Sequence, residues 1–302
     1  MNAMTFKVRK SEAGLHLFER TSGLNVLFDE FRVPTEHFSK APRYVSMALT
    51  NACGLRCSYC YAPKNSAKLE MGDVIRWATE LDGAGCLGIG FGGGEPTNHP
   101  QFSQLCKEIA ASTSMAVTFT THGHRLTADL ADALRGSVHF VRLSVDGVGA
   151  TYERLRRRSF SSVLGAAGLL RSVSPFGINM VVNADTISEL DDIVAFANDV
   201  GASELLLLPE QRTSGTSGIS MADSNRLVRW IETSDTHIRL AISRSGLEGL
   251  VSSVEVIPNE NSSSAHLHVD AAGVLRPNAY SPLGENIGQS IMDAVHALKE
   301  AM

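Results

Sequence analysis

The 302-residue chain has little of what secretion, membrane insertion or general nucleic-acid binding requires. It contains only five cysteines, an odd number that does not suggest a disulfide framework. No apolar run approaches the roughly 20 residues of a membrane helix. The first residues, Met-Asn-Ala-Met-Thr-Phe, are not a basic stretch followed by an apolar segment. We therefore expect a cytoplasmic protein without a membrane partner.

Charge excludes a further class of protein. The 27 basic and 32 acidic residues give a formal net charge of −5, and the longest basic run, 154–158, is short and isolated. Nucleic-acid binding needs a broad basic surface, so we expect no nucleic-acid partner. A hydrophobic content of 43% with 20% charged residues is ordinary for a globular protein.

Apolar segments of strand length alternate with segments of helical periodicity. The helical pattern is clear at 102–109 and at 190–197, where apolar residues recur on one face. This alternation predicts an α/β fold with parallel strands, and six units fall short of the eight that close a barrel. The predicted buried strands are 44–50, 86–91, 116–121, 140–145, 178–183 and 205–208.

The two ends of the chain predict smaller additions. Alternating residues from Phe6 to Phe28, with turn signals at Gly14 and Gly23, predict a β-hairpin or a three-stranded sheet, which either covers the barrel or binds a peptide along its edge. We accordingly expect an N-terminal sheet at 1–43, a core at 44–235 and a C-terminal extension at 236–302. The extension is predicted to contain a strand at 238–242, a loop at 259–264, a hairpin at 266–277 that turns at 272–273, and a closing helix at 287–302.

Three cysteines lie within eight residues, at Cys53, Cys57 and Cys60. A structural zinc ion or an electron-carrying cluster normally takes four protein ligands. His37 and His99 are the nearest histidines, and neither has a fixed spacing to this loop. Three thiolates therefore favour an iron–sulfur cubane with one iron left open to a small molecule. Cys86 and Cys106 lie in apolar patterns and are expected in the core.

The spacing Cys-x3-Cys-x2-Cys, with Tyr59 before the last cysteine, resembles the cluster loop of radical S-adenosylmethionine (SAM) enzymes. The resemblance implies a partial, six-stranded TIM-like barrel that carries a [4Fe–4S] cluster and SAM as cofactors. It also implies reductive cleavage of SAM to a 5′-deoxyadenosyl radical, which abstracts hydrogen from a substrate. An external one-electron reductant of the flavodoxin or ferredoxin type is then required.

Further motifs follow the later strands in order. Residues 92–96, Gly-Gly-Gly-Glu-Pro, resemble the family motif that holds the amino group of SAM. The resemblance also implies SAM contacts at the ends of later strands and in the helix that follows the fourth strand. Relatives often read Thr-Asn-Gly after the third strand, whereas this chain has His122 there, followed two residues later by His124. A contact of His122 with SAM or substrate and a local structural role both remain open. The residues assigned to the SAM site are Tyr59, Gly93, Gly94, Glu95, Ser144, Asp146, Arg156, Asn183 and Leu208.

The C-terminal segment resembles the extension of peptide-modifying radical SAM enzymes. Asn278 stands where that group places its first auxiliary-cluster cysteine, and no cysteine follows Cys106. We therefore expect one cluster only and a redox-neutral outcome. The expected substrate is a ribosomally synthesised peptide, with a small molecule such as a nucleoside, sugar or cofactor precursor as the alternative. A non-catalytic iron–sulfur protein is the remaining possibility.

Overall fold

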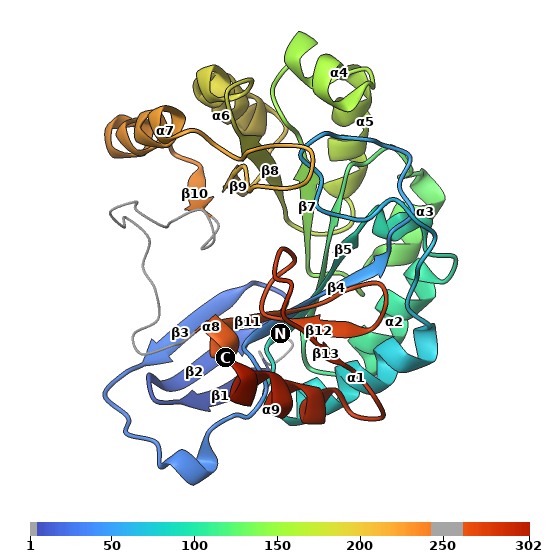
Figure 1. Ribbon diagram of the computed structural model, residues 1–302, viewed down its shortest axis with the longest axis vertical. Helices are drawn as coiled ribbons and strands as arrows, with labels where there is room; N and C mark the ends of the chain where they lie inside the picture. The colour runs from blue at the N-terminus through green and yellow to red at the C-terminus, as the bar shows by residue number, and fades with distance from the viewer. Residues whose placement is uncertain (1–4, 243–261) are drawn as a thin grey trace.

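The computed structural model describes residues 5–242 and 262–302 and shows one large sheet flanked by helices (Figure 1). Strands β4 to β10 are consecutive and parallel, in the order β10-β9-β8-β7-β6-β5-β4. The order continues as β11-β12-β13, in which β11 is parallel to β4 and the last two strands are antiparallel. Among the described strands the sheet is curved but does not close, so the partial barrel that the sequence predicts is confirmed.

The strands of the large sheet are β4 (Tyr44–Thr50), β5 (Gly88–Gly93), β6 (Ala116–Thr121), β7 (Phe140–Ser144), β8 (Phe176–Val182), β9 (Glu204–Pro209), β10 (Arg239–Ile242), β11 (His266–Val269), β12 (Val274–Arg276) and β13 (Glu285–Asn286). All six predicted strands are present, and β4 and β6 have the predicted bounds. Strand β5 begins two residues later than predicted because the amide of Cys86 still donates to Leu81 O at the end of the preceding helix. Asn183 lies just beyond β8, which ends at Val182.

The helices are α1 (Met71–Gly83), α2 (Phe102–Ser112), α3 (Ala128–Leu134), α4 (Ala150–Arg156), α5 (Ser161–Leu170), α6 (Leu190–Asp199), α7 (Met221–Thr233), α8 (Ser262–Ala265) and α9 (Ile291–Ala301), with 3-10 turns η1 (Thr35–His37), η2 (Pro96–Asn98) and η3 (Ile187–Glu189). In the described ranges, no helix is both long enough and apolar enough to cross a lipid bilayer.

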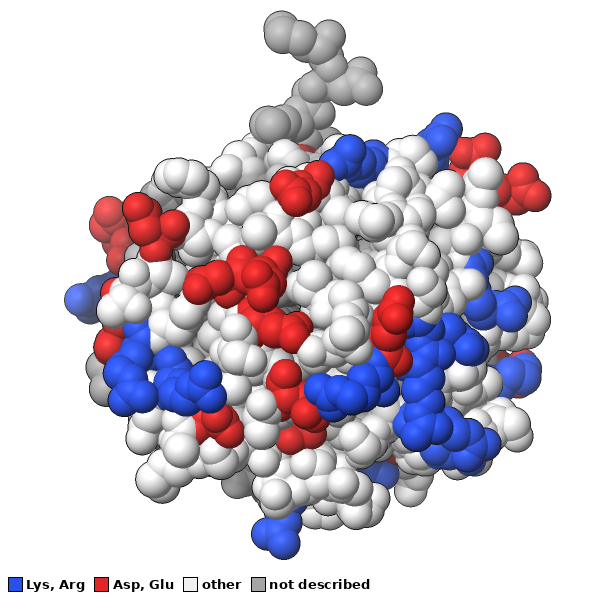
Figure 2. All heavy atoms as spheres, turned by 90° about the horizontal axis from the view of Figure 1, so that it is seen from above, with Lys and Arg blue, Asp and Glu red and all other residues white. Residues whose placement is uncertain are grey.

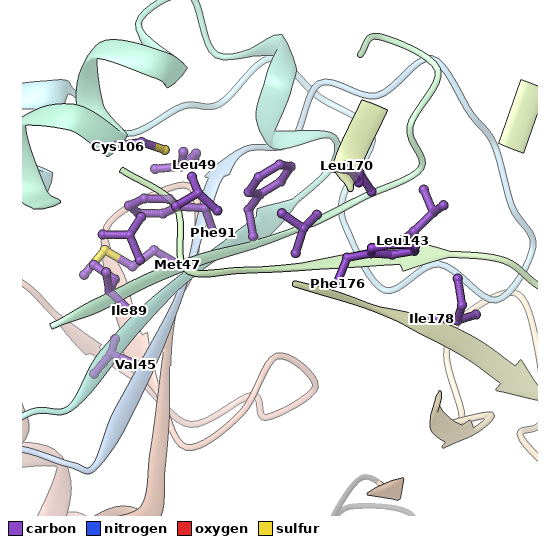
Figure 3. Close-up of a cluster of buried hydrophobic side chains, with 14 of the residues drawn as sticks. Val45, Met47, Leu49, Ile89, Phe91, Cys106, Leu143, Leu170, Phe176 and Ile178 are labelled. Atoms are coloured by element: carbon purple, nitrogen blue, oxygen red, sulfur yellow. The ribbon is translucent and has the colours of Figure 1, made fainter. Parts of the chain in front are cut away.

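The hydrophobic core lies between the outward face of the parallel sheet and its helices (Figure 3). Alternate strand residues such as Val45, Met47 and Ile89 point into it and are fully buried. Cys86 and Cys106 belong to the same core, as predicted, and burial raises the pKa of the Cys86 thiol to about 11. Because side chains alternate along a strand, the intervening residues face the inside of the barrel.

The N-terminal segment forms a separate three-stranded antiparallel sheet of β1 (Lys7–Ser11), β2 (Gly14–Glu19) and β3 (Leu24–Phe28). Gly14 makes the first turn with φ +115°, and a Cβ there would lie 2.1 Å from Phe28 O. Arg9 fastens this sheet to the barrel by donating to Ala41 O at 2.8 Å and to Gly85 O at 3.1 Å. Its role, as a cover of the barrel or as a peptide-binding edge, stays a prediction.

The C-terminal segment extends the barrel sheet itself. The predicted hairpin is present as β11 and β12, and it turns where Gly273 has φ +80°. The predicted loop at 259–264 is only partly described. Residues 259–261 lie outside the described ranges, and the prediction is wrong for residues 262–264, which belong to α8. The carbonyl of Ser264 accepts from the amide of Arg43 and from Arg9, so this turn is held against the barrel.

The closing helix is α9, and it begins four residues later than predicted. Its start is set by Ser290, whose hydroxyl accepts from the amides of Met292 and Asp293 and donates to Glu80 of α1. The division at 43/44 and 235/236 stays a prediction.

Candidate active site

A cavity of about 1060 Å³ extends along the inner face of the parallel sheet. Every strand from β4 to β9 contributes side chains or glycines to it at alternate positions. Strand β5 contributes Gly88, Gly90 and Gly92, and no atom lies within 4 Å of the Cβ position of Gly92. A Cβ on Gly90 would lie 1.8 Å from the Tyr44 hydroxyl oxygen, so Gly90 makes room for the Tyr44 side chain, whereas Gly92 leaves the cavity open at its own position. The three loop cysteines line the same cavity.

The cysteine loop follows β4, at the carboxyl end of the barrel strands, where catalytic groups of parallel barrels gather. Its thiols are free and partly exposed to the cavity. Lys64 Nζ donates to Cys60 Sγ at 3.3 Å, and the Leu55 amide donates to Cys53 Sγ at 3.4 Å. Burial raises the pKa of the Cys53 thiol, and the nearby Glu95 carboxylate raises it further.

Glu95 lies beside this loop and is almost completely buried, at 1% exposed. Its Oε1 accepts from the Thr97 hydroxyl at 2.7 Å, the Thr97 amide at 3.3 Å and the Thr121 hydroxyl at 2.8 Å. Its Oε2 accepts only from the His122 amide, at 3.0 Å. Burial raises the pKa of Glu95, while these hydrogen bonds oppose the rise. Oε2 can therefore accept a further hydrogen bond from a ligand in the cavity.

Two glycines bring the Glu95 backbone against the cysteine loop. The Gly94 amide donates to Thr50 O at 2.7 Å and the Glu95 amide donates to Ala52 O at 2.9 Å. A Cβ on Gly94 would lie 2.5 Å from Ala52 O and 2.6 Å from Asn51 O. Gly93 has φ +104°, a conformation that only glycine adopts easily. The glycines thus hold the carboxylate next to the thiols.

Asp146 is buried beneath the cavity and is not among the residues that line it. It accepts from the Tyr59 hydroxyl at 2.5 Å and from the Val181 amide at 2.7 Å, and it forms an ion pair with Arg156. The guanidinium of Arg156 lies over the Tyr59 ring, 5.9 Å from its centroid. Burial opposes the charge on Arg156, but Asp146, Tyr59 and Cys57 outweigh it and raise its pKa.

The structure places the remaining predicted site residues as follows. Ser144 and Leu208 line the cavity. Asn183 does not line it, because its side-chain oxygen accepts from the Asp185 amide and the Thr186 hydroxyl and so closes the turn after β8. His122 lines the cavity, and its ring Nε2 lies 3.4 Å from Glu95 Oε2.

Sequence reasoning missed an aromatic wall next to the cysteine loop. Tyr61 contacts Tyr280 with ring centroids 5.3 Å apart and His268 at 6.3 Å, and all three residues line the cavity. His268 is held by Ser46, whose hydroxyl lies 2.8 Å from its Nδ1. The alternation along 266–269 could have placed His268 on the inner face, but the pairing of β11 with β4 has no signal in the sequence.

Charge on the molecular surface is mixed. On the face shown in Figure 2, basic and acidic groups are interspersed among uncharged residues, and acidic groups separate the basic clusters. Two of the cations that line the cavity have partners next to the cysteine loop, since Arg156 pairs with Asp146 and Lys64 contacts Cys60.

The donor and acceptor set tests which ligands fit. Among the described residues, no three His, Cys, Asp or Glu side chains converge closely enough for one metal ion. The thiols therefore suit a cluster that binds each thiolate through a different iron. Glu95 offers an acceptor, whereas Arg156 Nε and His122 Nε2 are buried donors that make no hydrogen bond. These features define an enzyme site at the carboxyl end of a partial barrel, built for a thiolate-bound cluster and a zwitterionic ligand.

The chain belongs to the radical SAM superfamily, whose family model matches residues 47–197. Enzymes of this superfamily use a [4Fe–4S] cluster and SAM. The three thiols, the glycine cradle and the unpartnered donors described above fit both cofactors.

Individual relatives cover part of the chain. It is 30% identical over 207 residues to mycofactocin maturase MftC from Mycobacterium ulcerans. The matched segment covers 65% of this chain and 53% of the relative. It is 35% identical over 135 residues to GTP 3′,8-cyclase from Chlorobaculum tepidum, and this matched segment covers 43% of this chain and 39% of the relative. The chain spans about half the length of the curated relatives it matches.

A solved structure shares the fold over most of the chain. Streptococcus suis SuiB bound to the precursor peptide SuiA matches with a TM-score of 0.76, covering 96% of this chain and 87% of SuiB at 13% identity. At this identity the match shows the fold alone.

Proposed function

We propose that this protein cleaves SAM reductively at a single [4Fe–4S] cluster and abstracts hydrogen from a ribosomally synthesised peptide that it modifies. The observation that carries the proposal is the junction of the cysteine loop with Glu95, which joins cluster ligands and an amino-group acceptor at one end of one cavity. When bound, the cluster and SAM supply an electron and a 5′-deoxyadenosyl radical. An external one-electron reductant of the flavodoxin or ferredoxin type would supply the electron to the cluster. Three free thiols suit the reducing cytoplasm.

The residues of this chain divide the work by chemical type. Cys53, Cys57 and Cys60 would hold the cluster and leave one iron to SAM. Glu95 Oε2 accepts from the ammonium group of SAM, because its other oxygen is already saturated by protein donors. Arg156 supplies positive charge beside Cys57, and Asp146 holds Arg156 and Tyr59 in position.

The residues that border the cavity support a peptide substrate. Its lining includes Gly23 and Asn25 of the N-terminal sheet and Tyr280 of the C-terminal segment, so both predicted additions border the space where substrate binds. The similarity to mycofactocin maturase MftC and the shared fold with SuiB, whose structure holds a precursor peptide, agree with this substrate class.

A small-molecule substrate is the second candidate, and one observation favours it. The match to GTP 3′,8-cyclase has a higher identity, 35%, than the match to mycofactocin maturase, although it covers less of the chain. A second observation speaks against a triphosphate. Arg142 and Arg239 line the cavity near the amino end of the strands, and both form ion pairs with Glu204. Because Glu204 balances part of their charge, this end is less suited to a triphosphate than an uncompensated cluster would be.

The experiment compares both substrate classes in one protein preparation. Anaerobically reconstituted and reduced protein is incubated with SAM and either peptides encoded beside its gene or GTP, and 5′-deoxyadenosine and substrate mass are measured. The proposal expects one peptide to raise 5′-deoxyadenosine formation and to change in mass, with GTP inactive. If GTP instead raised 5′-deoxyadenosine formation and changed in mass, and no peptide did, the proposal would be wrong and the second candidate function would replace it.

A further inference from the structure

His122, one of the residues that line the cavity, carries a fixed proton on its ring Nε2. It follows β6 directly, and its Nδ1 accepts from the backbone amide of His124 at 3.1 Å. A ring nitrogen that accepts carries no proton, so in the neutral ring the proton resides on Nε2. Burial, and after it the charges of Arg156 and Arg158, lower the pKa of His122 to about 4, which keeps the ring neutral near pH 7. Nε2 is therefore an obligatory donor.

This donor has no hydrogen-bond partner among the residues that the structure describes. The side chain of His122 is 7% exposed, and Nε2 makes no hydrogen bond, since Glu95 Oε2 at 3.4 Å lies outside hydrogen-bond geometry. A buried donor left unsatisfied costs about 1–3 kcal/mol, so a ligand that accepts from it gains affinity. The neighbouring His124 is different: its Nε2 lies 3.1 Å from the Tyr152 hydroxyl and its Nδ1 lies 3.2 Å from the Ser162 hydroxyl.

A second unpartnered donor lines the same cavity. Arg156 Nε makes no hydrogen bond, although its Nη2 pairs with Asp146. After burial, the charge of Arg156 has the largest effect on the pKa of His122. Because Glu95, His122 and Arg156 all line this cavity, they supply it with one carboxylate acceptor and two unpaired N–H donors. An α-amino acid presents the complementary set, an ammonium group and a carboxylate with two oxygens.

We propose that His122 Nε2–H binds the carboxylate of the methionine end of SAM, beside Arg156 Nε–H, while Glu95 binds its ammonium group. The inference rests on the proposed function, because it assigns a residue of this chain to the SAM site.

The test pairs variants of the protein with variants of the ligand. Affinities for SAM and for decarboxylated SAM, which keeps the ammonium group and lacks the carboxylate, are measured by calorimetry on anaerobically reconstituted protein. His122→Phe keeps a planar ring without the donor, and His122→Asn keeps a donor. His124→Phe, whose wild-type ring is fully partnered within the protein, is the matched control. We expect His122→Phe to weaken SAM binding by about 10- to 100-fold, the effect of a hydrogen bond to a charged group.

The other arms decide between a contact and a structural effect. His122→Phe should bind decarboxylated SAM within about twofold of wild type, and His122→Asn should bind SAM within about fivefold. His124→Phe should leave both affinities unchanged. Equal losses for both ligands in His122→Phe, or no loss for either, would overturn the inference while leaving the proposed function standing. Failure of the wild-type protein to bind SAM would overturn the proposed function itself.

A measurement on the unaltered protein covers the case in which His122→Phe does not fold. The ring ¹⁵N signals of His122 should show a protonated Nε2 before ligand is added. Addition of SAM should shift the Nε2 signal, and decarboxylated SAM should not. A protonated Nδ1, or the same shift with both ligands, would contradict the assignment.

Discussion

The Tyr59 hydroxyl donates a 2.5 Å hydrogen bond to Oδ2 of Asp146, which lies 87 residues further along the chain. Tyr59 belongs to the cysteine loop after β4, whereas Asp146 follows β7. Because Asp146 also pairs with Arg156 and accepts from the Val181 amide, one buried carboxylate connects the cysteine loop to the opposite wall of the cavity. The pKa of Tyr59 is raised by burial first and by Asp146 second, so its hydroxyl remains a donor.

Removal of this carboxylate should therefore be costly. Asp146→Asn leaves Arg156, whose side chain is 11% exposed, without its counterion, and breaking a buried pair costs about 3–5 kcal/mol. Tyr59→Phe removes one hydrogen bond and should lower the free energy of unfolding by about 1 kcal/mol. Urea denaturation measures both. Asp132→Asn, which breaks an exposed pair with Arg135, is the control and should change stability by less than about 0.5 kcal/mol. A loss no larger in Asp146→Asn than in this control would contradict the assigned role.

Gly94 should tolerate no side chain. A Cβ there meets the backbone of Asn51 and Ala52 at 2.5–2.7 Å, so Gly94→Ala must push β5 away from the cysteine loop. We expect it to lower both the iron content after reconstitution and the melting temperature. Gly165→Ala is the matched control, since nothing lies within 4 Å of that Cβ position in α5 and alanine favours a helix by about 1 kcal/mol. It should raise the melting temperature, and full iron content in Gly94→Ala would contradict the packing argument.

Glu95→Gln tests the acceptor next to the thiols. The substitution removes the negative charge and places an amide N–H₂ among four donor contacts that the carboxylate now accepts. We expect SAM affinity to fall by at least about 100-fold, because an ammonium–carboxylate hydrogen bond is lost and the surrounding donors are left poorly paired. Calorimetry measures the affinity, and circular dichroism confirms the fold. Wild-type affinity in Glu95→Gln would exclude Glu95 from the site.

Stability should fall on mild acidification. Burial is the main cause that lowers the pKa of five histidines to about 4, below the ordinary value near 6.5: these are His122, His124, His139, His266 and His268. Between these values the unfolded chain binds more protons than the folded chain, so the stabilisation present above pH 6.5 is lost as the pH falls through about 4. The urea midpoint should drop between pH 7 and pH 4.5. A midpoint that stays constant over this interval would contradict the burial of these rings.

Sequence reasoning predicted the barrel because its signals are local. The strand at 44–50 and the strand at 116–121 are apolar runs with clear ends, and the structure has the same bounds. The glycines before Glu95 likewise mark a close backbone approach, which the structure places against the cysteine loop.

What the sequence could not reveal depends on contacts between distant segments. Asp146 follows the end of a strand, a position typical of ligand-binding residues, yet its carboxylate is buried and contacts Arg156 and Tyr59. These three residues are far apart in the sequence and come together only in the fold. Asn183 is likewise drawn into a turn by Thr186. The aromatic wall of Tyr61, Tyr280 and His268 arises because β11 pairs with β4. This pairing joins distant parts of the chain, since Ser46 and its partner His268 are 222 residues apart in the sequence.

The most direct measurement is 5′-deoxyadenosine formation by anaerobically reconstituted, reduced protein supplied with SAM, compared between wild type and Cys57→Ala. Wild type should form 5′-deoxyadenosine in a reductant-dependent manner, and Cys57→Ala should form none, because two thiolates cannot hold the cluster that three are placed to hold. Formation of none by wild-type protein with an intact cluster would indicate a non-catalytic iron–sulfur protein. Equal formation by Cys57→Ala would contradict the site itself.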